Sequence, residues 1–340
     1  MTKKKILVTG GAGYIGAHTA LEVVQSGYEA VIVDDLSRSN RSLLEGMEKI
    51  TGKKPDFHEG DCNDRNFLRK VFKSQGPISC VMHFAAYKSV GESVQKPLIY
   101  YNNNIGSLVA LLEVMQEFGV KDLIFSSSCT VYGQPDLIPV DESAPFKRAE
   151  SPYGATKQMC ERILEDAYIT GLRVISLRYF NPIGAHPSAL MGELPIGVPN
   201  NLVPFITQTA AGKREKLTVF GNDYNTPDGS CLRDFIHVVD VAIAHIKAME
   251  YLNRQDSSNR YEAFNLGTGI GVSVLELIDK FQKVTGVKLP YTVGLRRPGD
   301  VEKVYADPTK VNNALGWKTK YSMEEGLLHA WEWEKKLPKV

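Results

Sequence analysis

The chain has 340 residues, in which 40 lysine and arginine residues nearly balance 39 aspartate and glutamate residues. This length suffices for one large or two medium-sized domains with a substantial core. The near-zero net charge argues against a nucleic-acid or membrane-surface partner, because both would favour an extended basic field. No apolar stretch approaches the length of a membrane-spanning helix.

The N-terminal segment has the pattern of a dinucleotide-binding unit. Apolar residues 6–8 predict a buried strand, and Gly10, Gly13 and Gly16 follow at Gly-x-x-Gly-x-x-Gly spacing. Residues 17–27 predict a helix that ends at a glycine. Glycines at this spacing permit a tight turn and let backbone N–H groups approach a pyrophosphate, which the helix N-terminus also attracts.

An acidic residue ends the second predicted strand. Asp34 follows the apolar residues 30–33 and stands twenty-four residues after Gly10. A carboxylate at this point can bond an adenosine ribose and repels a 2′-phosphate. The order strand, glycines, helix, strand and acid therefore predicts NAD rather than NADP, and the neighbouring Asp35 adds to that preference.

The five cysteines predict a reducing compartment. They are odd in number and scattered, without a Cys-x-x-Cys pair, and the seven histidines show no ligand spacing. This distribution predicts neither a disulfide framework nor a metal site. The apolar run after Lys3–Lys5 is too short for the core of a secretory signal. We therefore expect a cytoplasmic protein with reduced thiols.

Strand-like and helix-like segments alternate through the first half of the chain. Further strands are predicted near residues 56–60, 79–84, 121–128 and 172–179, and helical periodicity runs over residues 105–118 and 153–168. Such alternation predicts an α/β fold with a Rossmann-like, doubly wound parallel sheet covered by helices on both faces. Ligands of these sheets bind beyond the carboxyl ends of the strands.

Proline and glycine become frequent after residue 180, which indicates a change of organisation. We expect residues 1–180 to form an NAD-binding domain and residues 181–340 to form a smaller C-terminal α/β domain that binds the substrate. Two later segments, Phe235–Val238 and Tyr261–Leu266, are expected to return to the large sheet.

A tyrosine and a lysine stand four residues apart in a predicted helix, at Tyr153 and Lys157. This spacing places both side chains on one helix face. Because a nearby ammonium favours a phenolate, we expect Lys157 to lower the pKa of Tyr153 and make it a general base near neutral pH. Ser128 ends a predicted strand at the same edge of the sheet, where its hydroxyl can bond a substrate alcohol or the phenol.

Together these features resemble the extended short-chain dehydrogenase/reductase family, and within it the UDP-galactose 4-epimerases. Matching stretches span nearly the whole chain, at residues 8–16, 91–97, 125–128, 130–133, 178–182, 184–187, 199–202, 220–224, 233–234, 236–238 and 296–300. The resemblance implies reversible epimerisation of UDP-galactose and UDP-glucose at C4, through a transient 4-keto sugar and NADH. It also implies a UDP-hexose substrate, tightly held NAD and a homodimer, with the helices over residues 105–118 and 153–168 as candidate contact surfaces.

The resemblance further implies roles for individual residues. Tyr153, Lys157 and Ser128 would be catalytic. The residues expected at NAD are Gly10, Gly13, Tyr14, Ile15, Gly16, Asp34, Asp35, Asp61, Cys62, Phe84, Ala85, Lys88, Asn103, Lys157 and Tyr179. Those expected at the UDP-sugar are Lys88, Ser128, Thr130, Tyr179, Phe180, Asn181, Asn200, Asn201, Leu202, Thr218, Phe220, Arg233, Arg297, Asp300 and Val304. The residue types suit this role, because arginine forks match diphosphate oxygens and an aromatic face matches a uracil ring.

The small side chain of Val304 has a specific implication. In the family that the chain resembles, a bulky tyrosine at this wall accompanies exclusion of N-acetyl sugars. Val304 therefore implies activity on UDP-N-acetylglucosamine and UDP-N-acetylgalactosamine as well. A shift of one residue along an extended strand would turn Tyr305 inward instead.

Two alternatives stay open. The first is another nucleotide-sugar enzyme of the same fold, such as a 4,6-dehydratase, which needs an acid and base pair directly after the strand-end serine. This chain has Cys129 and Thr130 there. The second is a catalytically silent NAD-binding sensor or scaffold, against which the complete set of Ser128, Tyr153 and Lys157 argues.

Overall fold

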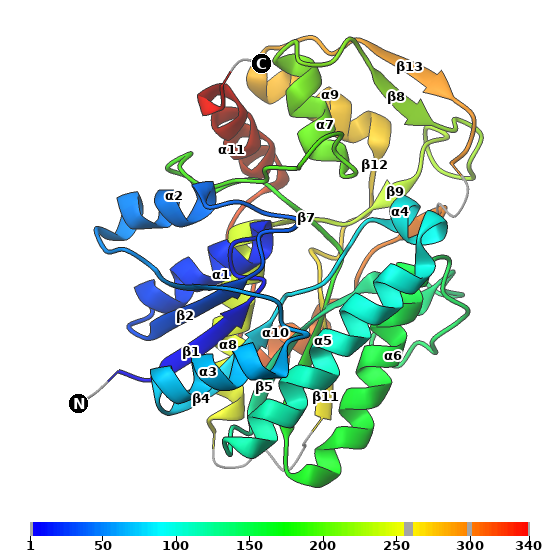
Figure 1. Ribbon diagram of the computed structural model, residues 1–340. Helices are drawn as coiled ribbons and strands as arrows, with labels where there is room; N and C mark the ends of the chain where they lie inside the picture. Colours follow the sequence, from blue (N-terminus) through cyan, green and yellow to red (C-terminus); the bar gives the residue numbers. More distant parts are fainter. Residues whose placement is uncertain (1–2, 255–260, 298–300, 339–340) are drawn as a thin grey trace.

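The computed structural model describes residues 3–254, 261–297 and 301–338. A parallel sheet of seven strands forms its centre, with the strand order β11-β6-β5-β4-β1-β2-β3 (Figure 1). The strands are β1 (Lys5–Thr9), β2 (Glu29–Asp34), β3 (Asp56–Glu59), β4 (Ile78–His83), β5 (Asp122–Ser128), β6 (Arg173–Tyr179) and β11 (Tyr261–Leu266). The order reverses beside β1, and ligands of open parallel sheets bind at such a switch point. The predicted fold class is confirmed.

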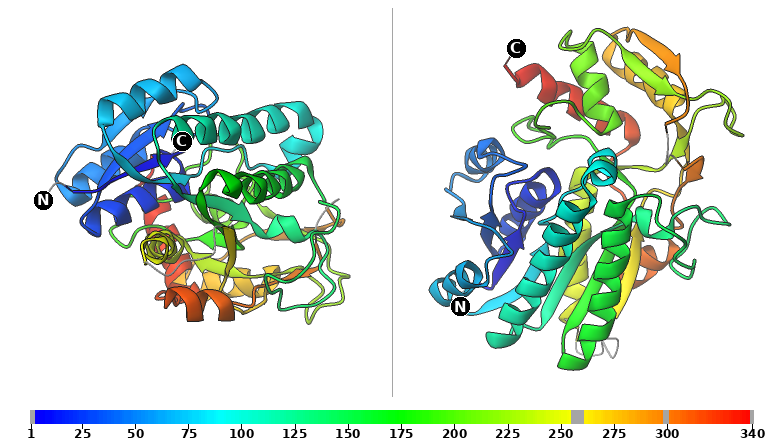
Figure 2. Two further views of the ribbon diagram at one scale, coloured as in Figure 1. Left: turned by 90° about the horizontal axis from the view of Figure 1, so that it is seen from below. Right: turned by 45° about the vertical axis from the view of Figure 1, so that its right-hand side comes forward.

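Helices cover both faces of this sheet (Figures 1 and 2). One face is covered by α3 (Arg65–Gln75), α5 (Pro97–Glu117) and α6 (Pro152–Ala167), and the other by α1 (Tyr14–Gln25) and α8 (Val238–Leu252). The helix α2 (Ser42–Thr51) packs against α1, and α10 (Thr309–Leu315) packs against α8.

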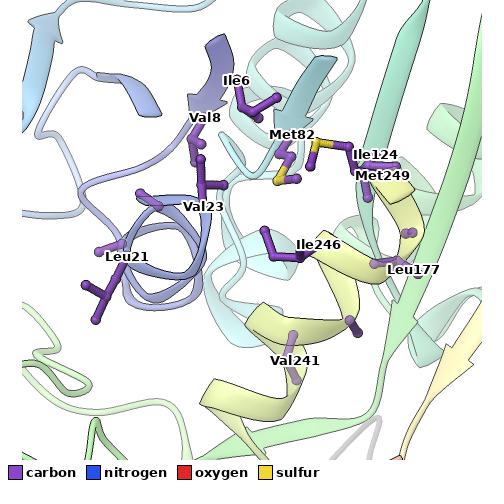
Figure 3. Close-up of a cluster of buried hydrophobic side chains, with 14 of the residues drawn as sticks. Ile6, Val8, Leu21, Val23, Met82, Ile124, Leu177, Val241, Ile246 and Met249 are labelled. Atoms are coloured by element: carbon purple, nitrogen blue, oxygen red, sulfur yellow. The ribbon is translucent and has the colours of Figure 1, made fainter. Parts of the chain in front are cut away.

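The interiors of β1, β2 and β4 are mostly apolar because both faces of the sheet are buried there, whereas the edge strand β3 is polar at both ends and partly exposed. Along β1, Ile6 and Val8 face α1 and α8, whereas Leu7 faces the opposite helices. Figure 3 shows the first of these two cores, in which Val23 of α1 and Ile246 of α8 meet side chains from the strands. Because successive residues of a strand enter opposite cores, continuous apolar runs rather than alternating ones predicted these strands.

A smaller assembly stands beyond the carboxyl ends of the central strands (Figure 1). Its strands form three small sheets: β7 (Asn181–Ile183) with β10 (Phe235–His237), β8 (Leu217–Phe220) with β13 (Tyr291–Gly294), and β9 (Leu232–Arg233) between β12 (Val272–Ser273) and β14 (Lys303–Val304). The accompanying helices are α7 (Leu202–Ala210), α9 (Val274–Thr285) and α11 (Met323–Lys336). The short helix α4 (Val90–Gln95) packs against α5 and α6, and the 3-10 turns η1 (Cys129–Tyr132) and η2 (Tyr168–Thr170) also contact α6.

One predicted return to the large sheet is confirmed and the other is wrong. The segment Tyr261–Leu266 pairs in parallel with β6, with Tyr261 opposite Val174. The segment Phe235–His237 pairs instead with β7, in a separate sheet. The physical reason is that β11 already occupies the free edge of β6, so the second segment pairs with the strand that follows β6. Among the described helices, none has both the length and the apolar character needed to cross a membrane.

Candidate active site

A cavity of about 330 Å³ lies at the carboxyl ends of the central strands. Its lining comes from the loops after β1, β2, β3 and β4, from the end of β5 and from α6. Every residue predicted to bind NAD lines this cavity, as do Tyr153, Asn200 and Asn201. The residues predicted from the glycine pattern and from the Tyr-x-x-x-Lys pattern therefore meet in one place.

The glycine-rich turn after β1 has no room for side chains. Gly10 has a φ of +68°, and a Cβ there would lie 2.6 Å from the backbone nitrogen of Ala85. A Cβ on Gly16 would lie 2.2 Å from the carbonyl oxygen of Gly10. Gly13 is the N-cap of α1 and has no side chain to accept hydrogen bonds from the N–H groups of the first helical turn. This bare helix N-terminus fits the pyrophosphate of a dinucleotide.

Carboxylates dominate the end of β2. The buried Asp34 accepts hydrogen bonds from Ala12 N (3.0 Å), Leu36 N (2.9 Å) and Ser39 Oγ (2.8 Å). Burial raises the pKa of Asp34, and these hydrogen bonds oppose that shift. The neighbouring Asp35 also lines the cavity. Two carboxylates here fit a ribose with free hydroxyls better than a 2′-phosphate.

The two arginines nearest this turn already have carboxylate partners. Arg38 pairs with Glu92 at 2.9 Å and lies over the ring of Tyr87. Arg41 pairs with Glu59 at 2.6 Å. Their engagement with protein groups agrees with the predicted preference for NAD over NADP.

The predicted catalytic side chains converge at the start of α6. Ser151 caps this helix by accepting a hydrogen bond from Gly154 N, and Tyr153 and Lys157 then share one face. The Ser128 hydroxyl lies close enough to the Tyr153 phenol to lower the pKa of that phenol. Lys157 Nζ donates to the carbonyl oxygen of Ser126 at 2.5 Å and lies 5.9 Å from the centre of the Tyr153 ring. A phenol and an ammonium thus share one corner of the cavity, with the Ser128 hydroxyl beside the phenol.

The predicted direction of the Tyr153 pKa is wrong for the polypeptide alone. Burial raises the pKa of Tyr153, and the Ser128 hydroxyl only partly opposes the rise. Burial also lowers the pKa of Lys157, to about 8, against the effects of Cys160 and Glu161. The physical reason is that both groups lose solvation while the ammonium points at a backbone carbonyl. A further positive charge is needed to bring the phenol into the range of a neutral-pH base.

Most residues predicted for the UDP-sugar lie beyond the lining of this cavity. They come from the end of β5, the segments after β5 and β6, the start of α7, the small sheets and the segment after β13: Ser128, Thr130, Phe180, Asn181, Leu202, Thr218, Phe220, Arg233, Arg297 and Val304. Asp300 lies outside the described residues. The structure brings some of them together, since the Arg297 guanidinium lies 5.7 Å from the Phe220 ring centre and Arg233 pairs in register with Val304.

Two polar atoms in this region favour a polar ligand. Thr130 Oγ1 and Asn181 Oδ1 are buried and have no hydrogen-bond partner among the described residues. Buried polar groups in folded proteins are normally paired. Thr130 follows Ser128 in η1, and Asn181 begins β7 directly after β6. The two atoms therefore mark places where a bound sugar or diphosphate can supply the partner.

Val304 faces inward and Tyr305 does not. The Val304 side chain is 6% exposed and belongs to an apolar cluster with Phe180, against which Cys129 packs. The Tyr305 ring lies against Gly271 instead, where a Cβ would come within 2.7 Å of it. The structure thus turns the small valine, rather than the tyrosine, into the cluster that contains Phe180.

Motif reasoning missed one charged residue of the cavity. Glu193 accepts hydrogen bonds from Lys88 Nζ (3.1 Å) and Asn201 Nδ2 (2.6 Å), two residues predicted to contact ligands. Its backbone oxygen accepts a hydrogen bond from Trp333 Nε1. A single acidic residue within a proline- and glycine-rich segment belongs to no motif, so the sequence pattern did not predict its contacts with Lys88 and Asn201. In the described parts of the chain, no group of three His, Cys, Asp or Glu side chains could hold a metal ion.

The chain is similar to known proteins over nearly its full length. A family described as GDP-mannose 4,6 dehydratase matches residues 7–329. UDP-glucose 4-epimerase of Bacillus subtilis (strain 168) is 50% identical over 331 residues, which are 97% of this chain and 96% of the relative. The structure of UDP-glucose 4-epimerase from Bifidobacterium longum in complex with NAD+ and UDP is 42% identical, covers 98% of both chains and has a TM-score of 0.93. The structure from Stenotrophomonas maltophila, with bound NAD and formylated UDP-arabinopyranose, is 46% identical over 98% of both chains, also with a TM-score of 0.93.

Proposed function

The chain belongs to the UDP-glucose 4-epimerase family, and from that premise we propose that it is an NAD-dependent isomerase that interconverts UDP-glucose and UDP-galactose at C4. The observation that carries this proposal is the convergence of Tyr153 and Lys157 at the cavity that all the expected NAD-binding residues line, with the Ser128 hydroxyl beside the phenol. A non-catalytic scaffold would have no need of that convergence.

Residues around the glycine-rich turn would hold the cofactor. The bare N-terminus of α1 suits the pyrophosphate, and Asp34 suits the adenosine ribose. Lys157, which lines the cavity beside Tyr153, would bond the nicotinamide ribose. Bound NAD supplies an acceptor for the hydride of C4 and a donor that returns it. The similarity to epimerases crystallised with NAD supports this choice of cofactor.

Tyr153 would take the proton of the C4 hydroxyl and later return it. With a pKa of about 8, Lys157 is mostly protonated at neutral pH and contributes one positive charge. The charge of an oxidised nicotinamide would contribute a second, which offsets the effect of burial on the pKa of Tyr153. Ser128, whose hydroxyl lies beside the phenol, would align the sugar hydroxyl.

The UDP part of the substrate would be held by residues that take no part in the chemistry. Phe220 offers a ring for the uracil, and Arg233 and Arg297 offer guanidinium groups for the diphosphate. Anchoring at UDP leaves the hexose free to present either face of C4. Binding energy from the nucleotide then supports a reaction at the sugar. We further propose that residues 181–340 form the substrate-binding domain, apart from β11 and the helices α8 and α10, which belong to the large sheet and its cover.

A Tyr153→Phe variant tests the proposal. We expect it to retain bound NAD, because the ring and its packing remain, and to lose epimerase turnover by about 10²- to 10⁴-fold. Tyr168→Phe is the matched control, since Tyr168 is exposed at the far end of α6 and should leave turnover unchanged. Turnover of Tyr153→Phe at the wild-type rate would rule out the assigned base.

The 4,6-dehydratase alternative lacks suitable groups. Cys129 and Thr130 occupy the positions directly after Ser128. Burial raises the pKa of the Cys129 thiol to about 12, although the charge of Arg233 opposes the shift. Neither a protonated thiol nor a hydroxyl suits the acid and base work that dehydration between C5 and C6 demands.

We also propose activity on N-acetylated UDP-hexoses. The support is the inward position of the small Val304 in the cluster that contains Phe180 and against which Cys129 packs. A Val304→Tyr variant should lose turnover of UDP-N-acetylglucosamine and keep that of UDP-galactose, whereas Val304→Ile should retain both. Absence of any wild-type turnover of the N-acetyl sugar would refute this part.

A homodimer and a cytoplasmic location complete the proposal. Leu98 and Ile99 of α5 and Met159 of α6 are exposed apolar side chains, and Leu98 is 79% exposed. Covering them in a second copy would remove them from water. Light scattering should give a dimer for the wild type and a monomer for Leu98→Asp. The five free cysteines support the location.

A further inference from the structure

The inner face of α6 carries a third polar residue besides the tyrosine and lysine. Glu161 stands one turn after Lys157 and is fully buried. The hydroxyl of Ser127 donates a hydrogen bond to Glu161, while the carbonyl of the preceding Ser126 accepts one from Lys157. Successive residues of β5 therefore hold successive turns of α6.

The carboxylate of Glu161 also joins two further strands. Arg178 of β6 donates to it from Nε (3.0 Å to Oε1) and from Nη2 (2.7 Å to Oε2), and Tyr261 of β11 donates its hydroxyl at 2.8 Å. The side chain of Arg178 is almost completely buried. One carboxylate thus ties α6 to three neighbouring strands, and three kinds of donor satisfy it.

The guanidinium of Arg178 extends this network to η1. It donates to the hydroxyl of Tyr132 at 2.8 Å, and that hydroxyl donates to Asn265 Oδ1 at 2.6 Å. The same guanidinium lies over the rings of Tyr132 and Phe146. Because η1 begins directly after Ser128, the network fixes both the segment that carries the serine and the helix that carries Tyr153.

The network lies behind the cavity. None of Glu161, Arg178, Tyr132 and Tyr261 lines it, so none is placed to touch a ligand bound there. A buried ion pair also contributes little net stability, because removing two charges from water offsets their attraction. Its effect is directional: hydrogen bonds at fixed angles specify the position of a helix, whereas apolar contacts do not.

We propose that the Glu161–Arg178 pair is a positioning device that sets the placement of Tyr153 and Lys157 relative to Ser128. This inference rests on the proposed epimerase function, because the groups that it positions are those that move the proton. Neutral side chains of similar size would preserve the packing and release the helix by a fraction of an ångström. A misplacement of about 1 Å can lower a rate by about 100-fold.

The test is the double variant Glu161→Gln/Arg178→Met, which removes both charges and keeps an acceptor for Tyr261. We expect it to fold, to bind NAD and to keep KM for UDP-galactose within about threefold, while kcat falls by about 10- to 100-fold. The matched control is Asp122→Asn/Arg173→Met, which removes an ion pair between the amino ends of β5 and β6. In that pair two nitrogens of Arg173 each donate a hydrogen bond of 2.7 Å to Asp122. This control should leave kcat unchanged.

The following outcomes decide whether the Glu161–Arg178 pair positions the catalytic residues. A folded double variant with bound NAD and wild-type kcat would overturn the inference and leave the proposed function intact. An equal loss of kcat in the control would also overturn the inference. Removal of an ion pair far from Tyr153 would then lower kcat as much as removal of the Glu161–Arg178 pair. Failure of the wild type to convert UDP-galactose would remove the proposed function itself. If the double variant does not fold, Glu161→Asp, which keeps the charge and shortens the side chain, should show the same selective loss of kcat, and a wild-type kcat there would overturn the inference.

Discussion

Replacing Lys157 with methionine separates the catalytic role of this residue from its energetic cost. The side chain is 3% exposed, and its Nζ donates to Ser126 O at 2.5 Å. Burial lowers the pKa of Lys157 to about 8. Its ordinary value is about 10.5, so the ammonium is disfavoured in the folded protein at neutral pH by roughly 3 kcal/mol. Methionine has a similar length and carries no such penalty.

The sign of the resulting pH dependence follows from proton binding. Between about pH 8 and about pH 10.5 the unfolded chain holds the Lys157 proton and the folded chain releases it, so wild-type stability gains from rising pH through this residue. The methionine variant lacks this gain. The free energy of unfolding of the variant minus that of the wild type should therefore fall by roughly 1.4 kcal/mol between about pH 7 and about pH 9. Loss of the bond to Ser126 adds an offset that does not vary with pH.

Two assays check this prediction. Urea denaturation at the two pH values gives the difference in unfolding free energy, and formation of UDP-glucose from UDP-galactose gives turnover. We expect kcat of Lys157→Met to fall by about 10²- to 10⁴-fold. A stability difference that does not change with pH would refute the buried ammonium. Unchanged kcat would refute its role beside Tyr153.

Further predictions concern the glycine turn and the buried histidines. Gly16→Ala should lose NAD binding and about 1–3 kcal/mol of stability, because its Cβ would collide with the carbonyl oxygen of Gly10. The control Gly91→Ala lies in open space within α4 and should keep both NAD binding and stability. Isothermal titration measures the binding, and urea denaturation measures the stability. Burial and the charges of nearby histidines lower the pKa of His237 to about 3, and burial lowers that of His18 to about 4. The unfolded chain therefore binds more protons below about pH 6.5, and each histidine removes about 1.4 kcal/mol of stability per pH unit as the pH falls from there toward about 4. Denaturation at several pH values should show a shallower loss for His237→Asn, and an unchanged slope would contradict the assignment.

The central sheet was predictable because strands buried on both faces carry continuous apolar runs. Residues 6–8 illustrate this, since alternate members enter opposite cores. The pairing of short strands was not predictable in the same way. Phe235–His237 and Tyr261–Leu266 both combine apolar and polar residues, and the competition for the edge of β6 decides which one joins the large sheet.

The candidate site was predictable where local geometry places the residues. Helix spacing sets Tyr153 and Lys157 on one face, and a strand end sets Ser128 beside them. The direction of the Tyr153 pKa was not predictable, because it depends on burial by distant parts of the chain. Glu161 was missed for the same reason: its partners Arg178 and Tyr261 come from other strands.

The central claim is that hydride leaves C4 of the sugar and returns to the same carbon within one site. UDP-galactose labelled with deuterium at C4, incubated with the purified protein in ordinary water, tests it most directly. The account predicts UDP-glucose that retains the deuterium at C4. Replacement of the label by solvent hydrogen would contradict it, because the carbon would then have exchanged a proton with water.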